Sequence, residues 1–66
     1  MTDLEMDITS VENSIECCAY DYRNSTQASQ HHRVKWAKLV HRELNWLREN
    51  APDNYLLKQD FSDIPA

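Results

Sequence analysis

The sequence predicts an all-α protein: a helical hairpin of two long helices, followed by a short C-terminal helical turn or an extended tail. Three observations lead to this fold class. The chain of 66 residues has no glycine, the residue on which tight β-hairpin turns depend. Apolar residues recur at steps of three and four near the N-terminus. A second apolar face of helical period ends before Pro52.

The first helix is expected to run from about residue 3 to residue 23. One capping box begins at Thr2 and another at Thr9, so the start is open between residue 3 and residue 10. The apolar residues alternate in steps of three and four, the spacing of a seam that faces one neighbouring helix. The seam consists of Leu4, Ile8, Val11, Ile15, Cys18 and Tyr22. It is interpreted either as a core stripe of the hairpin or as a self-association seam between two copies.

A polar stretch follows the first helix. Residues 24–32 hold no large apolar side chain, and we expect the chain to turn there. In a chain without glycine, Asn24 is the candidate for a left-handed helix stop. Ser25, Thr26 or Ser29 can then cap the next helix. The alternative is one long helix with a polar middle, and we favour the break.

The second helix is expected from about residue 26 to residue 50, with its start open between residues 26 and 30. It ends at residue 50 because Pro52 pushes Ala51 out of helical geometry. A helical projection places an apolar face on this segment, formed by Trp36, Ala37, Val40, Leu44, Leu47 and Ala51. Leu39 and Trp46 lie on the adjacent flank. This surface is wider than one facing helix covers, so we expect Trp36, Leu39 and Trp46 to contact another protein.

The C-terminal tail, residues 51–66, is too apolar for a plain linker. Asp53 is expected to cap a short helical turn there. The apolar side chains of the tail, Leu56 among them, form either a lid over the protein's own helices or a hook that docks on a partner. Tyr55, Leu57 and Phe61 are the tail residues expected at a protein interface.

The chain is expected to form one small helical domain, residues 1–66. Apolar burial and the loss of chain entropy nearly cancel for a monomer of this size. We therefore expect a second copy, in a dimeric helical bundle, together with an unidentified partner protein.

Charge is distributed unevenly along the chain. Residues 1–23 carry a net charge of −5, residues 24–50 carry +3, and residues 51–66 carry −2. An acidic helix beside a basic one fixes which helices pair, and Glu12 and Glu16 are expected to pair with the second helix. A basic stripe on that helix provides a possible nucleic-acid contact, formed by Lys35, Lys38 and Arg42.

Catalytic and metal chemistry are not expected. Without glycine the chain cannot form a phosphate-binding loop or a dinucleotide fingerprint. The adjacent Cys17 and Cys18 and the adjacent His31 and His32 lack the spacing of a metal site. We expect no enzyme, no cofactor, no metal and no small-molecule substrate. The chain has no apolar run long enough for a membrane span, and its acidic N-terminus is unlike a secretory signal, so we expect a cytoplasmic protein.

A resemblance adds a biological setting. The length, the acidic first helix and the segment from Val34 to Arg48, which leads to Asn50, Ala51 and Pro52, are similar to those of the small helical accessory proteins of lambdoid phage early regions. The resemblance implies a protein of the host cytoplasm that adjusts host or phage development by contact. A small DNA-associated transcriptional regulator that uses the basic stripe is the alternative.

Overall fold

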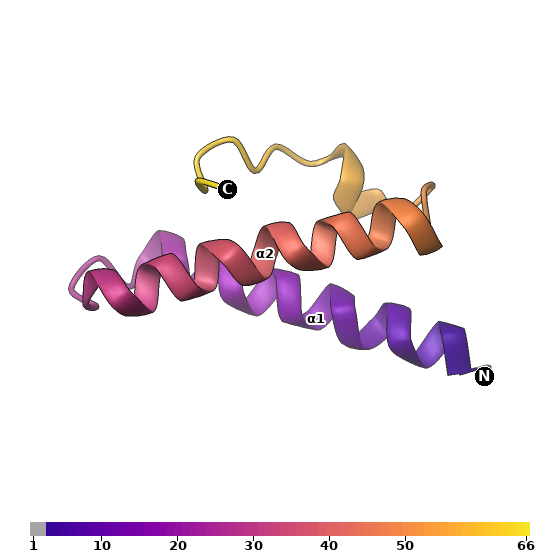
Figure 1. Cartoon of the computed structure of the whole chain (residues 1–66), viewed down its shortest axis with the longest axis horizontal. Helices are drawn as coiled ribbons and strands as arrows, with labels where there is room; N and C mark the ends of the chain where they lie inside the picture. The colour runs from indigo at the N-terminus through magenta and orange to yellow at the C-terminus, as the bar shows by residue number, and fades with distance from the viewer. Residues whose placement is uncertain (1–2) are drawn as a thin grey trace.

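The computed structural model describes residues 3–66. It contains helix α1 (Asp3–Asn24), helix α2 (Gln30–Asn50) and the 3₁₀ helix η1 (Tyr55–Lys58). Helices α1 and α2 run antiparallel as a hairpin, and the C-terminal segment turns back along α2 (Figure 1). The described part of the chain measures 39 × 20 × 15 Å. The predicted all-α hairpin with a short C-terminal helical turn is confirmed.

The start of α1 at Asp3 agrees with the earlier of the two starts that the sequence allowed. The capping box that begins at Thr2 lies outside the described residues. The prediction of a capping box at Thr9 is wrong, because Thr9 lies inside the helix and its Oγ1 donates to the carbonyl of Glu5 at 3.0 Å. Asp3 and Glu5 place negative charge in the first turn, where it interacts favourably with the helix dipole.

The predicted break lies between Asn24 and Gln30. Ser29 caps α2, since its backbone is extended and its Oγ accepts from the amide of His32. The left-handed stop at Asn24 is wrong, because no residue among 3–66 has a positive φ. The amide of Ser25 still donates to the carbonyl of Asp21 at 2.8 Å, and the loop is long enough to turn through right-handed conformations. Helix α2 begins at Gln30, at the late end of the predicted start between residues 26 and 30.

Helix α2 ends where Pro52 predicts. The backbone of Ala51 has left helical geometry, with φ −147° and ψ 66°, and its amide makes the last helical hydrogen bond, to the carbonyl of Leu47 at 2.7 Å. The expected cap at Asp53 is wrong, because Asn54 caps η1 instead. Its Oδ1 accepts from the amide of Leu56 at 3.0 Å.

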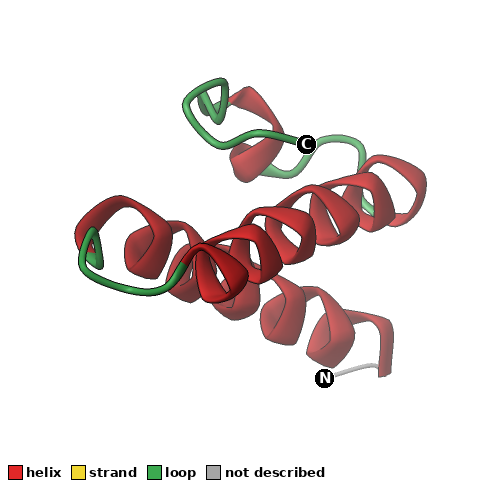
Figure 2. Ribbon diagram, turned by 60° about the vertical axis from the view of Figure 1, so that its left-hand side comes forward, coloured by secondary structure: helices red, strands yellow, loops and turns green. Residues whose placement is uncertain are grey.

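The core is built around α2. This helix packs along α1, and the C-terminal segment runs back along α2 and also contacts α1 (Figure 2). Side chains from all three elements and from the end of the chain meet there. The buried residues are Ile15, Ala19, Ala37, Val40, Leu44, Leu47, Leu56, Phe61 and Ile64. Within residues 3–66, no helix is both long enough and apolar enough to cross a membrane.

The C-terminal segment is a lid over the protein's own helices, which decides between the two alternatives for the tail. Leu56, Phe61 and Ile64 are buried. His41 of α2 donates from Nε2 to the carbonyl of Ile64 at 2.6 Å. This bond holds the last buried residue against the middle of α2.

Candidate protein interface

The side of the hairpin away from the C-terminal segment leaves apolar side chains at the surface. On α1, Val11 and Cys18 lie roughly 120–140° around the helix from the positions that contact the C-terminal segment. On α2, Leu39 and Trp46 lie about 140–160° around the helix from His41. These two flanks meet on one side of the hairpin, which we call the open face. Its apolar residues are Leu4, Val11, Cys18, Trp36, Leu39 and Trp46.

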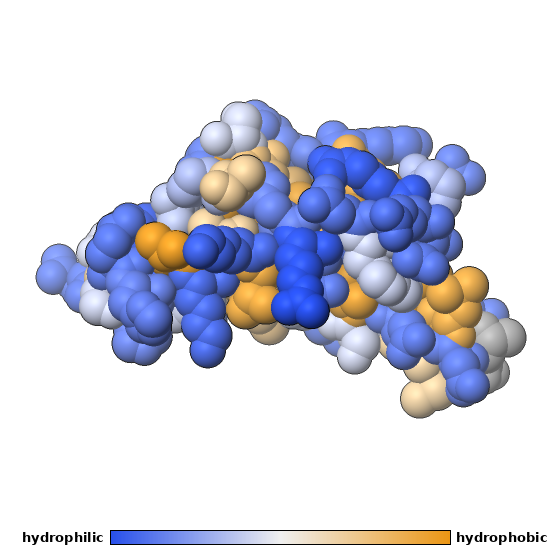
Figure 3. Space-filling view, in the orientation of Figure 1, coloured by the Kyte–Doolittle hydropathy of each residue, from blue (hydrophilic) through white to orange (hydrophobic). Residues whose placement is uncertain are grey.

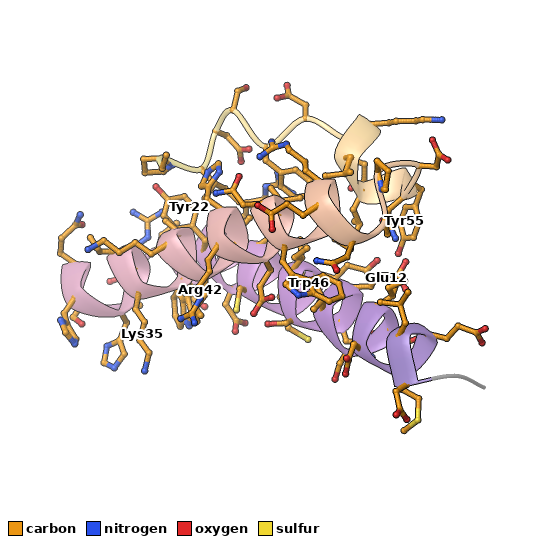
Figure 4. All side chains as sticks on the ribbon, turned by 45° about the vertical axis from the view of Figure 1, so that its right-hand side comes forward. Glu12, Tyr22, Lys35, Arg42, Trp46 and Tyr55 are labelled. Atoms are coloured by element: carbon orange, nitrogen blue, oxygen red, sulfur yellow. The ribbon has the colours of Figure 1, made fainter. Side chains whose placement is uncertain are left out.

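The open face is only partly covered by the chain itself. Val11, Cys18 and Trp46 pack against the buried core but stay half-buried. Leu4 keeps 48% of its surface exposed at the N-terminal end of α1. Figure 4 shows Trp46 between α2 and α1, and Figure 3 shows apolar surface along the boundary between the helices. The hairpin alone does not shield this face from water.

The two edges of the open face carry opposite charge. The edge on α1, called the acidic edge, holds Asp3, Asp7 and Asp21. The edge on α2, called the basic edge, holds the exposed side chains of Lys35, Lys38 and Arg42. Figure 4 shows Lys35 and Arg42 pointing away from the C-terminal segment. A mainly apolar strip, interrupted by the half-buried carboxylate of Glu43 beside Cys18, therefore runs between a negative and a positive border.

The thiol of Cys18 is part of this apolar strip. Burial raises its pKa above the ordinary value, which outweighs a hydrogen bond to Ser14. The neighbouring carboxylates of Asp21 and Glu43 act in the same direction as burial. A thiol with a raised pKa is largely protonated at neutral pH and is a weak nucleophile. Cys18 therefore behaves as a small apolar residue.

On the opposite side of the hairpin, two groups of polar contacts, called the clasps, hold the C-terminal segment against α1. In the first, Arg23 of α1 binds Asp63 through both carboxylate oxygens, Nε to Oδ2 at 2.8 Å and Nη2 to Oδ1 at 2.9 Å. Nη2 also donates to the carbonyl of Asp60 at 3.2 Å, and the guanidinium lies 5.4 Å from the centre of the Phe61 ring. The hydrogen bond from Arg23 lowers the pKa of Asp63.

The second clasp joins the start of η1 to the middle of α1. The hydroxyl of Tyr55 donates to Oε1 of Glu16 at 2.5 Å, and Nδ2 of Asn54 donates to Oε2 of Glu12 at 3.2 Å. The bond to Glu16 raises the pKa of Tyr55 to about 12. Glu12 and Glu16 were expected to pair with the second helix. The structure pairs them with the C-terminal segment instead, because they lie on the side of α1 that faces it.

Two grooves flank the C-terminal segment. The first, of about 320 Å³, lies between α1 and this segment. The second, of about 380 Å³, lies between α2 and this segment, with Leu44, Leu56 and Ile64 among its lining residues and Arg48 beside them. In the part of the chain that the structure describes, no group of three or more His, Cys, Asp or Glu side chains is arranged to hold a metal ion.

No protein-family model matches this chain, and no curated protein or solved structure matches it.

The predicted seam of the first helix is divided by the structure. Ile15 is fully buried in the hairpin core, and Tyr22 packs beneath Arg33 of α2, whose Cζ lies 4.3 Å from the ring centre. Ile8, Val11 and Cys18 pack half-buried against the core, and Leu4 stays exposed. The core-stripe interpretation is therefore supported for every seam residue except Leu4, and self-association through the seam stays a prediction.

The predicted interface residues are also divided. Trp36, Leu39 and Trp46 are half-buried on the open face. Tyr55 keeps 49% of its surface exposed, but its hydroxyl binds Glu16. Leu57 packs against the core, and Phe61 is 9% exposed within it, so Phe61 belongs to the lid and is not available to a partner.

Sequence reasoning missed three contributors to this arrangement. Ala19 follows Ile15 by four residues and so lies on the same side of the helix. Its side chain is too small to stand out in the pattern of apolar residues. Ile64 stands alone near the C-terminus without a periodic pattern. Arg23 pairs with a residue 40 positions away, and no local signal marks such a contact.

Proposed function

We propose that this protein is a non-enzymatic regulatory protein that acts by contact with other proteins, and that its working form is a homodimer joined through the open face. The observation that carries this proposal is the half-buried apolar strip between two edges of opposite charge. An exposed apolar patch with a polar border is typical of a protein interface.

Charge complementarity favours a second copy as the occupant. A two-fold axis parallel to the helices turns one open face onto the other. It brings α1 of one protomer over α2 of its partner, so that each acidic edge meets a basic edge. By the hairpin register, Lys35 of one protomer then lies level with Asp21 of the other. A two-fold axis across the helices would instead set acid against acid.

The size of the face fits the same interpretation. Helix α1 has 22 residues and is about 33 Å long. Two helices of about 10 Å diameter side by side present roughly 650 Å² per protomer. Stable interfaces bury about 800 Å² per partner, so this face approaches the required area once the charged borders are included.

The assembly would be a four-helix bundle. Each α1 would lie antiparallel to its own α2 and to the partner's α2, the arrangement of an up-down bundle. Trp46 and Leu39 would move from the surface to the centre of the bundle. The setting that we propose is the regulation of host or phage development, which the resemblance to phage accessory proteins implies.

Sedimentation equilibrium at micromolar concentration tests the dimer. The native protein is expected to sediment at twice the chain mass. Trp46→Glu should produce a monomer, because it would bury an unpaired charge at the centre of the face. Tyr20→Glu is the matched control, since Tyr20 is 66% exposed on the far side of α1, and it should leave the dimer intact. A folded native monomer, or a dimer unaffected by Trp46→Glu, would refute the proposal.

A charge exchange tests the orientation of the two protomers. Lys35→Asp and Asp21→Lys should each weaken the dimer by about threefold to tenfold, and the double variant should recover most of the loss. If neither single variant weakens the dimer, the proposed orientation of the two protomers is wrong.

The basic edge supports a second candidate function, a DNA-associated regulator. Lys35, Lys38 and Arg42 are exposed on one side of α2, as phosphate contacts require. DNA affinity would fall steeply with salt and with Lys38→Glu, whereas the protein contact would depend on Trp46→Ala and change little at moderate salt. In the proposed dimer the basic edge faces the partner's α1, so strong dimerisation and DNA binding exclude each other.

A further inference from the structure

The groove between α1 and the C-terminal segment has an apolar floor. Ala19, Leu56 and Phe61 line it, and all three are buried in the core. Its volume of about 320 Å³ accommodates one branched aliphatic or aromatic side chain. Because the floor belongs to the folded core, the groove is preformed.

Tyr20 stands at the edge of this groove and is the most exposed large apolar residue of the described chain, at 66%. Within residues 3–66 its side chain makes no hydrogen bond and no aromatic contact, although its backbone carbonyl accepts from Nδ2 of Asn24. An exposed tyrosine ring offers apolar area, a hydroxyl and a face that attracts cations. This combination is typical of residues that contact a partner.

Carboxylates stand near both ends of the groove, in excess over Arg23, which lines one end. At one end Glu16 lines the groove and Glu12 stands near it beside Tyr55. At the other end Asp60 and Asp63 lie next to Arg23, whose single positive charge leaves one carboxylate in excess. A partner segment with basic residues on both sides of an apolar anchor would match this distribution of charge.

We propose that this groove binds a basic segment of a partner protein, with one apolar side chain inserted against Leu56 and Phe61. Lysine or arginine residues on either side of the anchor would meet Glu16 at one end and the Asp60–Asp63 cluster at the other. Tyr20 would cover the inserted side chain. The inference rests on the proposed function in that the protein acts by contact, but it uses the side of the hairpin opposite the open face.

Fluorescence anisotropy with three labelled peptides tests this site. The probe is an 11-residue peptide with a central leucine, two lysines on each side and serine elsewhere. One control peptide has glutamate in place of lysine, and the other has alanine in place of leucine. At low salt the probe should bind at least about tenfold more tightly than either control, because it alone supplies both the charge and the anchor. Equal binding of all three peptides would overturn the proposal.

Variants of the protein locate the binding site. Tyr20→Ser should weaken probe binding by about tenfold and Glu16→Gln by about threefold, while Met6→Ser, on an exposed part of α1 away from the groove, should leave it unchanged. Amide shifts in a ¹⁵N NMR titration should centre on Ala19 and Gln59. Shifts confined to the open face, or native affinity in Tyr20→Ser, would overturn the assignment.

The same titration on Trp46→Glu separates this inference from the proposed dimer. The probe should bind the monomeric variant as it binds the native protein, since the groove lies within one chain. If the native protein dimerises but does not bind the probe, the groove proposal is refuted and the dimer proposal is not. A native monomer that binds the probe refutes the dimer alone.

Discussion

Replacement of Leu56 by alanine tests whether the C-terminal lid is an integral part of the fold. Leu56 is 1% exposed and belongs to the buried core, in contact with α2 through η1. Truncation of a buried leucine to alanine costs about 2–5 kcal/mol, from lost burial and from the cavity left behind. A chain of this length has a total stability of about 3–10 kcal/mol. Leu56→Ala is therefore expected to remove a large fraction of the free energy of unfolding.

Leu57→Ala is the matched control, because the neighbouring leucine is only half-buried and should cost about 1 kcal/mol. Urea unfolding followed by circular dichroism at 222 nm measures both variants, at one protein concentration so that self-association does not bias the comparison. Hydrogen exchange at the amide of Ile64, which bonds to the carbonyl of Phe61 at 3.0 Å, shows whether the lid opens before the hairpin unfolds. A loss below about 1 kcal/mol in Leu56→Ala, or an equal loss in Leu57→Ala, would contradict the reasoning.

Three further predictions concern caps and titrating groups. Ser29→Ala should lower the stability of the fold by about 1 kcal/mol in urea unfolding, because it removes the N-cap of α2, and Ser29→Asp should retain most of it. The lowered pKa values of Asp60 and Asp63 mean that their contribution to stability is present above about pH 4 and is lost as the pH falls through the folded-state values. The melting temperature should thus drop in acid less steeply for Asp63→Asn than for the native chain. Spectrophotometric titration at 295 nm should find one tyrosine that ionises at about 12, and Glu16→Gln should return it toward 10 if its hydrogen bond to Tyr55 is the cause.

The hairpin itself could be predicted because its signals are local. The end of α2 follows from Pro52, and the break follows from a stretch without large apolar side chains. Ser29 was among three candidate caps, since each had a hydroxyl in the right region. These features depend on neighbouring residues, so a single sequence contains them.

The closure of the hairpin could not be predicted in the same way. Arg23 and Asp63 are 40 positions apart, and Tyr55 and Glu16 are 39 apart. Neither pair has a periodic signature, and an arginine near a helix end has many possible partners. The hydrophobicity of Phe61 predicts that its ring is buried, but it does not indicate which surface covers the ring. Phe61 was therefore assigned to a partner interface.

The C-terminal segment covers one side of the hairpin and leaves the other side bare. The packed core of the hairpin, in which Val40 and Leu47 are fully buried, separates these sides. A substitution at Trp46 on the open face therefore makes no direct contact with the groove beside Tyr20. In the arrangement that we propose, the subunit contact and the groove would each accept substitutions without a compensating change in the other.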